Sequence, residues 1–307
     1  MSNNLLAKFF LKIFDKNKYN SFKYKEKLKK IKNIYDRDIK HKIIEIDEVL
    51  KSKKEINFLH SGHLGDVIYS LPLIKEISKN KKCNLFIQIN KKMDLYYHDH
   101  PSGNVMINKK TADFLMPLLN SQTYLNSAFI YNHENIDIDL NLFREMPFNL
   151  IFHSIRWYSH LAGVNLNMED KFLDVKTKEN FKNKIIVVRS PRYRNQFINY
   201  NFLNNVKNIV CVGLESEYEQ LKKDIKYLEF YDCKNFLEMA EIIKSGKFFL
   251  GNQGFAFSVA EGLKTPRLLE ACPDFPVVFP LGSNAYDFYH QTHFEKYFEI
   301  LENKIYN

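Results

Sequence analysis

From residue 56 onward, short apolar runs alternate with longer segments in which apolar residues recur every three or four positions. The short runs predict strands and the longer segments predict helices, because side chains alternate across a strand but share one face of a helix at that spacing. In the first half of this region the pattern predicts strands at 56–60, 84–89 and 128–131, and helices at 65–78, 112–119 and 151–162.

The second half repeats the same alternation after a polar connector at 170–183. It predicts strands at 184–189, 208–212, 227–230, 248–250 and 267–270, and helices at 215–224, 235–245, 257–263 and 286–301. Strand and helix in alternation are typical of a parallel sheet covered by helices on both faces. We therefore expect an α/β protein of two Rossmann-like domains, at 56–178 and 179–285, with a closing helix at 286–307. Their strands should meet at a cleft along the carboxyl ends of both sheets.

The first 55 residues form a basic extension. They hold fifteen lysines and one arginine against eight acidic residues, and so carry +8 of the formal charge of +9. Helical spacing of apolar residues beside lysines predicts a short two-sided helix near residues 5–16, followed by a lysine-rich helical arm at 22–54. Two interpretations stay open for the short helix: it lies on an anionic membrane surface, or it packs on the body or on a second subunit as part of a homo-oligomer. For the arm the alternatives are a solvated charged surface and contact with phospholipid or glycolipid head groups.

Charge and cysteine usage narrow the class of protein. The nearly neutral body gives no reason to expect nucleic acid as a partner. Lys12 interrupts the first apolar run, which disfavours a signal peptide, and no later stretch has the roughly 20 apolar residues that span a bilayer. The cysteines have no paired spacing that would indicate a disulfide framework or a zinc site, so we expect a cytoplasmic protein; they are Cys83, Cys211, Cys233 and Cys272.

The segment 57–72 is the most informative motif. It predicts a strand, a turn that contains Gly62 and Gly65, and a helix that begins near Asp66. Glycines allow the backbone to turn tightly and to approach a ligand closely. Because an open α/β sheet binds ligands at this kind of strand end, both glycines and Asp66 are candidate site residues.

Three motifs together resemble the heptosyltransferase-like enzymes of glycosyltransferase family 9, which have the GT-B architecture. They are the run 65–72, the pair Val212-Gly213 followed by Glu215, and Gly251-Asn252-Gln253-Gly254 running on to 260–266. The resemblance extends from about residue 56 to the end of the chain. It implies a nucleotide-sugar donor bound beside Gly213, Glu215, Asn252, Gln253 and Gly254. Gln253 stands where the family has an acidic residue, and Ser258 where it often has histidine.

Transfer of a sugar from a nucleoside diphosphate needs a base for the acceptor hydroxyl and stabilisation of the departing diphosphate. Asp66 is the predicted base, a role that the resemblance also implies, and the alternative is that it only caps its helix. His63 is the second candidate base, because a neutral imidazole can accept a proton near its ordinary pKa of about 6.5. A lone loop histidine is more often a binding or structural residue.

Three arginines lie at the end of the strand at 184–189 or just after it: Arg189, Arg192 and Arg194. Guanidinium groups donate in pairs to phosphate oxygens, so we expect this cluster to bind the diphosphate without a metal. The alternative is that some of them pair with surface acids. Backbone amides near Gln253 and Gly254 could add donors at the start of the next helix. Glu215 and Glu261 are candidates for a ribose or sugar hydroxyl, and the alternative for Glu261 is an exposed helix residue.

Two other patterns carry less weight. Asp137-Ile138-Asp139 resembles a metal signature of the other large glycosyltransferase fold, but so short a pattern arises often by chance. His98-Asp99-His100 lacks the further ligands of a metal site. Motifs of nicotinamide enzymes, P-loop NTPases and α/β-hydrolases are absent from the sequence.

The sequence therefore predicts a metal-independent GT-B glycosyltransferase that needs no cofactor besides its nucleotide-sugar. The acceptor would be a cell-surface glycan or lipopolysaccharide-type glycolipid bound by the first domain, with 96–158 as the acceptor region. Two alternatives remain: a catalytically silent nucleotide-sugar-binding or scaffold protein, and a membrane-docked module driven by the basic arm.

Overall fold

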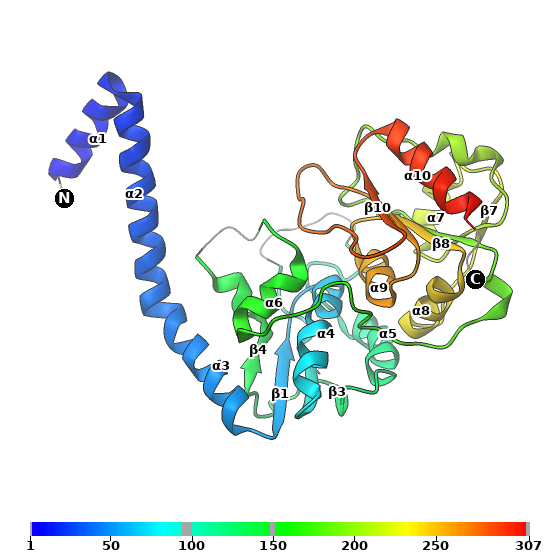
Figure 1. Cartoon of the computed structure of the whole chain (residues 1–307), viewed down its shortest axis with the longest axis horizontal. Coiled ribbons are helices and arrows are strands. Elements are labelled where there is room, and N and C mark those ends of the chain that lie inside the picture. The colour runs from blue at the N-terminus through cyan, green and yellow to red at the C-terminus, as the bar shows by residue number, and fades with distance from the viewer. Residues whose placement is uncertain (1, 94–99, 148–150, 305–307) are drawn as a thin grey trace.

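Two separate parallel sheets form the body of the protein (Figure 1). The computed structural model describes residues 2–93, 100–147 and 151–304, with side chains from residue 8 onward. The first sheet has the order β3-β2-β1-β4, and its strands are β1 (Glu55–His60), β2 (Lys82–Ile87), β3 (Ser127–Ile130) and β4 (Ile138–Asp139). All its pairings are parallel.

The second sheet has the order β10-β9-β8-β5-β6-β7 and is also parallel throughout. Its strands are β5 (Ile185–Val188), β6 (Ile209–Cys211), β7 (Leu228–Phe230), β8 (Phe248–Asn252), β9 (Arg267–Glu270) and β10 (Ala285–Phe288). The central strands β5 and β8 are buried along their whole length, as expected for a sheet covered on both faces. The predicted α/β class with two parallel sheets is confirmed.

Helices connect the strands in both halves. Those of the first half are α4 (Leu64–Ser78), α5 (Lys109–Asn120) and α6 (Ser154–Ala162), with the 3-10 turn η2 (Leu140–Glu145) after β4. Those of the second half are α7 (Glu215–Leu221), α8 (Phe236–Ser245), α9 (Phe255–Leu263) and α10 (Gln291–Asn303), with the 3-10 turns η3 (Glu179–Phe181) and η4 (Asn201–Asn205).

The sequence prediction is wrong at two places. Residues 286–288, expected at the start of a helix, belong to β10 and pair with β9, and α10 begins only at Gln291. The apolar residues there fit period two as well as a helical spacing, so the pairing partner decides the outcome. The strand β4 was not predicted, because two residues are too few to show a pattern.

The two halves pack directly on each other. Helix α4 contacts α9 of the second half as well as α6 of its own, and one buried apolar cluster includes residues of both sheets. The segment after α6 fastens to α9, since the backbone N–H groups of Phe172 and Leu173 both donate to the carbonyl of Gly262 at 2.9 Å. These contacts fix how the ends of the two sheets face each other.

The predicted helical extension is confirmed. It consists of α1 (Ser2–Phe14), α2 (Lys16–Ile34), a π-helical turn (Tyr35–Ile39) and α3 (Lys40–Ser52). Helix α3 packs on α6, and two residues of this region are buried, Ile39 at the end of the π-helical turn and Ile46 within α3. By contrast α2 has no buried residue, and Figure 1 shows α1 and α2 projecting away from the body. In the part of the chain that the structure describes, no helix combines the length and the apolar character needed to cross a membrane.

Candidate functional site

The turn after β1 carries the predicted base. Asp66 is the third residue of α4, and its Oδ2 accepts the backbone N–H of His63 at 3.3 Å. The same oxygen forms an ion pair with the guanidinium of Arg144, which lies on η2 directly after β4. Because β4 pairs with β1, the sheet brings these two side chains together. Asp66 thus caps its helix and also keeps 18% of its side chain exposed.

A buried hydrogen-bond chain supports this turn from below. The backbone N–H of Gly62 donates to His60 Nδ1 at 3.0 Å, so the ring proton sits on Nε2, which lies 3.0 Å from the Tyr158 hydroxyl. That hydroxyl donates in turn to the carbonyl of Asp66 at 3.0 Å. Burial lowers the pKa of His60 to about 3, which keeps the imidazole neutral and the chain intact.

The two glycines of the turn have different roles. A Cβ on Gly62 would lie 2.8 Å from His60 Cε1 and 3.0 Å from both Arg144 Nη2 and Asp66 Oδ2. A Cβ on Gly65 would meet only Ser258 Oγ, at an ordinary 3.8 Å. Gly62 therefore makes room for the Asp66–Arg144 pair. Gly65 marks where the first domain approaches α9 of the second.

His63 faces the second domain. Its ring lies 5.5 Å from that of His100, measured between centroids, and its buried Nδ1 has no hydrogen-bond partner among the described residues. Burial lowers the pKa of His63 while Asp66 opposes the shift, and burial lowers the pKa of His100 to about 4. The positive charge of Arg192 contributes to both shifts. The charge of Arg192 in the second domain therefore acts on the glycine turn of the first.

The loop that carries Arg192 is held in place by Asn252 at the end of β8. The side chain of Asn252 accepts the backbone N–H of Ser190 at 2.9 Å and donates to the carbonyls of Ser190 at 3.0 Å and Arg192 at 2.6 Å. Arg194 braces the same loop, because it donates to the Ser190 carbonyl at 2.9 Å and to Gln220 Oε1 at 2.6 Å. Asn252 and Arg194 thus position this loop.

Arg189 does not extend into the same region. Its guanidinium donates to both carboxylate oxygens of Glu270, at 2.7 and 2.9 Å, and lies 4.4 Å from the ring centroid of Tyr200. Both members of the ion pair are buried. The sequence analysis gave two alternatives for the three arginines, binding of a diphosphate and pairing with surface acids. Arg189 pairs with an acid, but that acid is the buried Glu270.

Glu217 is a residue that the sequence analysis missed. The predicted Glu215 is exposed on the first turn of α7, whereas Glu217 is buried and its Oε2 accepts the backbone N–H of Leu214 at 2.9 Å. A Cβ on Gly213 would meet that oxygen, so the Glu217 side chain would have to move to make room for it. Burial raises the pKa of Glu217, and the charges of Arg194 and Arg192 oppose the shift. A glutamate at the third position of a helix is the sequence signal that could have indicated it.

Gln253 and Gly254 lie on the second-domain side of the facing region. Gln253 is 6% exposed, and its Oε1 has no partner among the described residues. Gly254 is the residue before α9, and Ser190 Oγ lies 3.9 Å from where its Cβ would be. The arginine loop and the start of α9 are therefore neighbours. We use the name domain junction for the region formed by the loop that carries Arg192, Gln253 and the start of α9 in the second domain, together with the turn at 61–66 in the first domain.

Glu261 was expected either to bind a ribose or sugar hydroxyl or to be an exposed helix residue, and neither expectation fits the structure. Its side chain is fully buried and forms ion pairs with Arg267, at 2.6 Å, and with Lys264. Because both of its oxygens have cationic partners, the carboxylate stabilises the end of α9 and is not available to a ribose. The sequence shows only its helical position, and the two cations that hold it follow the helix.

The weaker patterns have structural explanations. Asp137 accepts the backbone N–H of Asn57 at 2.9 Å and pairs with Lys53, while Asp139 accepts the backbone N–H of Asn141 at 2.9 Å. His98 and Asp99 lie outside the described residues, as do 96–97 and 148–150 of the predicted acceptor region. Within the described ranges, no three His, Cys, Asp or Glu side chains gather as a metal site would require.

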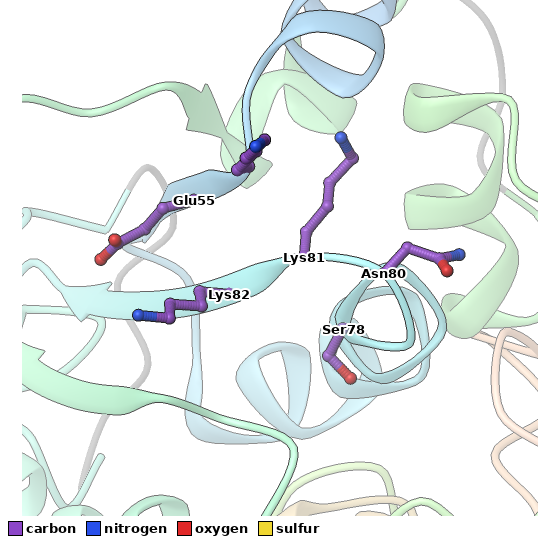
Figure 2. Close-up of a pocket in the computed structure, with 6 residues that line it drawn as sticks. Glu55, Ser78, Asn80, Lys81 and Lys82 are labelled. Carbon is purple, nitrogen blue, oxygen red and sulfur yellow. The ribbon is translucent and has the colours of Figure 1, made fainter.

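A surface hollow of about 490 Å³ lies at the opposite end of the first sheet. Figure 2 shows its lining, which comes from the amino ends of β1 and β2 and the end of α4: Lys54, Glu55, Ser78, Asn80, Lys81 and Lys82. Ligands of open α/β sheets bind at the carboxyl ends of the strands, so this hollow is separate from the domain junction.

Comparison with solved structures finds proteins whose fold is similar to that of this chain. The chain superposes on a glycosyltransferase family 9 protein from Veillonella parvula with a TM-score of 0.53 at 12% identity, over 76% of this chain and 86% of that one. It superposes on the E. coli heptosyltransferase WaaC with bound ADP with a TM-score of 0.55 at 9% identity, over 80% and 99% of the two chains.

A second structure of WaaC, with ADP-2-deoxy-2-fluoro heptose, gives a TM-score of 0.54 at 10% identity, over 81% of this chain and the whole of the other. No protein-family model and no curated protein sequence matches the chain. The similarity is thus one of three-dimensional structure. It confirms the GT-B fold that the three sequence motifs predicted, and it confirms the resemblance to family 9 at the level of the fold.

Proposed function

We propose that this protein is a glycosyltransferase that moves a sugar from a nucleoside diphosphate to a hydroxyl of a glycan or glycolipid acceptor, of the lipopolysaccharide type. The observation that carries the proposal is that the turn of the first domain with Asp66 lies close to the second domain: Ser258 of α9 is 3.8 Å from where a Cβ on Gly65 would be, and the charge of Arg192 acts on His63 of the same turn. The Asp66 carboxylate is 18% exposed and lies three residues after His63, whose pKa the charge of Arg192 lowers. A base and a cation on opposite sides of one junction suit transfer between an acceptor and a diphosphate.

In the proposed reaction, the oxygen of the acceptor hydroxyl attacks the anomeric carbon of the donor sugar, and Asp66 takes the proton of that hydroxyl. The bond between that carbon and the diphosphate oxygen breaks, and its electron pair leaves with the diphosphate. Arg192 would stabilise the developing negative charge. The backbone N–H groups at the start of α9, next to Gly254, would add donors to the same oxygens.

Arg144 has a positioning role in this scheme. Its ion pair with Asp66 fixes the direction in which the carboxylate points. His63 remains the second candidate base, because its Nδ1 is buried and without a partner among the described residues. Gln253 offers an equally unpartnered amide oxygen that could accept a hydrogen bond from a donor sugar hydroxyl.

We assign the donor to the second domain and the acceptor to the first, and propose that transfer requires neither a metal nor a further cofactor. The guanidinium of Arg192 and the backbone N–H groups at the start of α9 would supply the positive charge that a divalent ion provides in other transferases. A glycolipid acceptor would be reached at a membrane surface, so we also propose that the protein works as a peripheral protein on the cytoplasmic face.

The experiment combines nucleotide binding with turnover. Purified protein is screened for thermal stabilisation by nucleoside diphosphates and their sugar conjugates, since a ligand that binds only the native state raises the melting temperature. With the sugar conjugate found in this way, Asp66→Asn should keep the thermal shift and lose transfer by about 100-fold or more, because the amide cannot act as a base. His63→Gln is the matched control on the same turn, with a smaller expected loss. Equal turnover of Asp66→Asn and the unaltered protein would remove Asp66 from the mechanism.

A catalytically silent nucleotide-sugar-binding protein is the second candidate. Gln253 favours it, since a neutral amide stands where family 9 enzymes have an acidic residue. In that case the thermal shift persists, but neither transfer nor hydrolysis of any stabilising nucleotide-sugar is detected.

A further inference from the structure

The charge of the N-terminal extension is confined to its first two helices. Residues 1–34 contain ten lysines and only two acidic residues, Asp15 and Glu26, so they carry a net charge of +8. Residues 35–55 contain six basic and six acidic residues and are neutral. The neutral part includes α3, which packs on the body, and the charged part is the pair α1 and α2 that projects from it (Figure 1). We call this pair the basic hairpin.

The basic hairpin also exposes large apolar side chains. Those of α1 recur every three or four residues and so share one side of the helix, with exposed fractions of 62% for Phe9, 56% for Phe10, 57% for Ile13 and 78% for Phe14. Single exposed apolar residues are ordinary on protein surfaces, but a contiguous group of this size indicates an interaction site.

The hairpin is held closed in a way that leaves this apolar face outward. Lys8 of α1 pairs with Glu26 of α2 at 3.2 Å, and its ammonium lies 5.8 Å from the ring centroid of Phe22. The rings of Phe10 and Phe14 stack on each other at 6.1 Å instead of inserting between the helices. The apolar face of α1 therefore stays exposed, and the rest of the described chain does not cover it.

We propose that the basic hairpin binds the surface of an anionic lipid bilayer, with the apolar face of α1 entering the boundary between head groups and acyl chains. Interfacial helices combine these two features, an apolar face and flanking lysines that meet lipid phosphates. A second copy of this chain fits less well, because two surfaces of charge +8 repel each other. Nucleic acid would match the charge but would leave the aliphatic Ile13 and the adjacent phenylalanines without an apolar environment.

The position of the hairpin adds a reason for such docking. Helix α3 connects it to α6 of the first domain, the domain to which we assign the acceptor. Docking would therefore hold the acceptor domain at the membrane in which a glycolipid acceptor lies. Only this last point rests on the proposed function, since the charge and exposure of the hairpin are independent of it.

The test measures cosedimentation of the full-length protein with vesicles of phosphatidylcholine containing ~30% phosphatidylglycerol, with pure phosphatidylcholine vesicles as the comparison. The unaltered protein should bind the anionic vesicles and not the neutral ones. Replacing three exposed hairpin lysines, Lys23→Glu, Lys25→Glu and Lys29→Glu, should weaken binding by about 100-fold or more, at the typical gain per lysine near an anionic surface. The matched control makes the same change of charge on the body, with Lys176→Glu, Lys182→Glu and Lys207→Glu, and should leave binding unchanged.

A second variant, Phe9→Ser with Phe10→Ser and Phe14→Ser, should also weaken vesicle binding, because it removes the apolar face and keeps the charge. The proposal is overturned if the hairpin and body variants bind vesicles equally. It is also overturned if the phenylalanine variant loses only a concentration-dependent self-association, or if single-stranded RNA binds while vesicles do not. Turnover on a water-soluble acceptor fragment should be the same in all variants, so a failure of membrane docking is distinguishable from a failure of the proposed transfer.

Discussion

Replacement of Gly62 by alanine tests whether the turn is built around the Asp66–Arg144 pair. The new methyl carbon would lie 2.8 Å from His60 Cε1, closer than real contacts allow, and 3.0 Å from Asp66 Oδ2 and Arg144 Nη2. The His60 ring cannot swing aside without cost, because both of its nitrogens are hydrogen-bonded and it is fully buried. Overpacking of this kind typically costs about 2 kcal/mol.

The expected loss is measurable by thermal unfolding. At roughly 2–4 °C per kcal/mol for a body of this size, Gly62→Ala should lower the melting temperature by about 4–8 °C. The methyl group would also press on the Asp66 carboxylate, and a displacement of about 1 Å at a catalytic group costs on the order of 100-fold in turnover.

Gly65→Ala is the matched control, three residues along the chain. Its methyl group would make an ordinary contact of 3.8 Å with Ser258 Oγ, and Gly65 lies inside α4. Alanine is favoured over glycine in a helix by up to about 1 kcal/mol, so the melting temperature should stay the same or rise. If the two variants had the same melting temperature, the steric account of Gly62 would be refuted. If Gly62→Ala were destabilised but turned over normally, the turn would support only the fold.

Three further outcomes are expected. Arg192→Gln should weaken nucleoside diphosphate binding by about 10-fold or more in calorimetric titration and leave the free energy of unfolding nearly unchanged. Normal affinity in this variant would exclude Arg192 from the donor site. Arg189→Gln should instead destabilise the fold by about 3–5 kcal/mol, because it leaves Glu270 buried without a cation, and chemical unfolding of both variants separates the two roles. Acid should destabilise the protein, because burial lowers the pKa of His60 to about 3 and the pKa of His153 to about 4. The unfolded chain binds protons at these histidines below their ordinary pKa of about 6.5, whereas the folded protein does not. The stability that depends on the two neutral rings is therefore present above pH ~6.5 and is lost as the pH falls towards the two lowered pKa values. For the two histidines together, the free energy of unfolding in urea should fall by about 3 kcal/mol between pH ~7.5 and ~5.5. An unchanged urea midpoint over this range would contradict the prediction.

Local patterns gave much of the fold and part of the candidate site. Strands such as β1 and β8 were predicted because an apolar run bounded by glycine is a local signal. The position of Asp66 near the start of a helix was predicted from the same local pattern of apolar residues and glycines. Where two periods fit one stretch, as at 286–288, the local signal failed, since pairing with β9 is what makes those residues a strand.

The sequence by itself determined the alternation of strands and helices, the basic extension and the glycine turn with its acidic residue, because each of these depends on neighbours in the chain. Only the tertiary structure decided which charged groups are partners. Arg144 meets Asp66 across 78 residues of sequence, and Glu270 meets Arg189 across 81. The order of strands in each sheet sets these pairings, and no periodicity along the chain encodes that order. For the same reason, three arginines that look equivalent in sequence differ in structure: one is buried in an ion pair, one braces a loop, and the charge of Arg192 acts on the other domain.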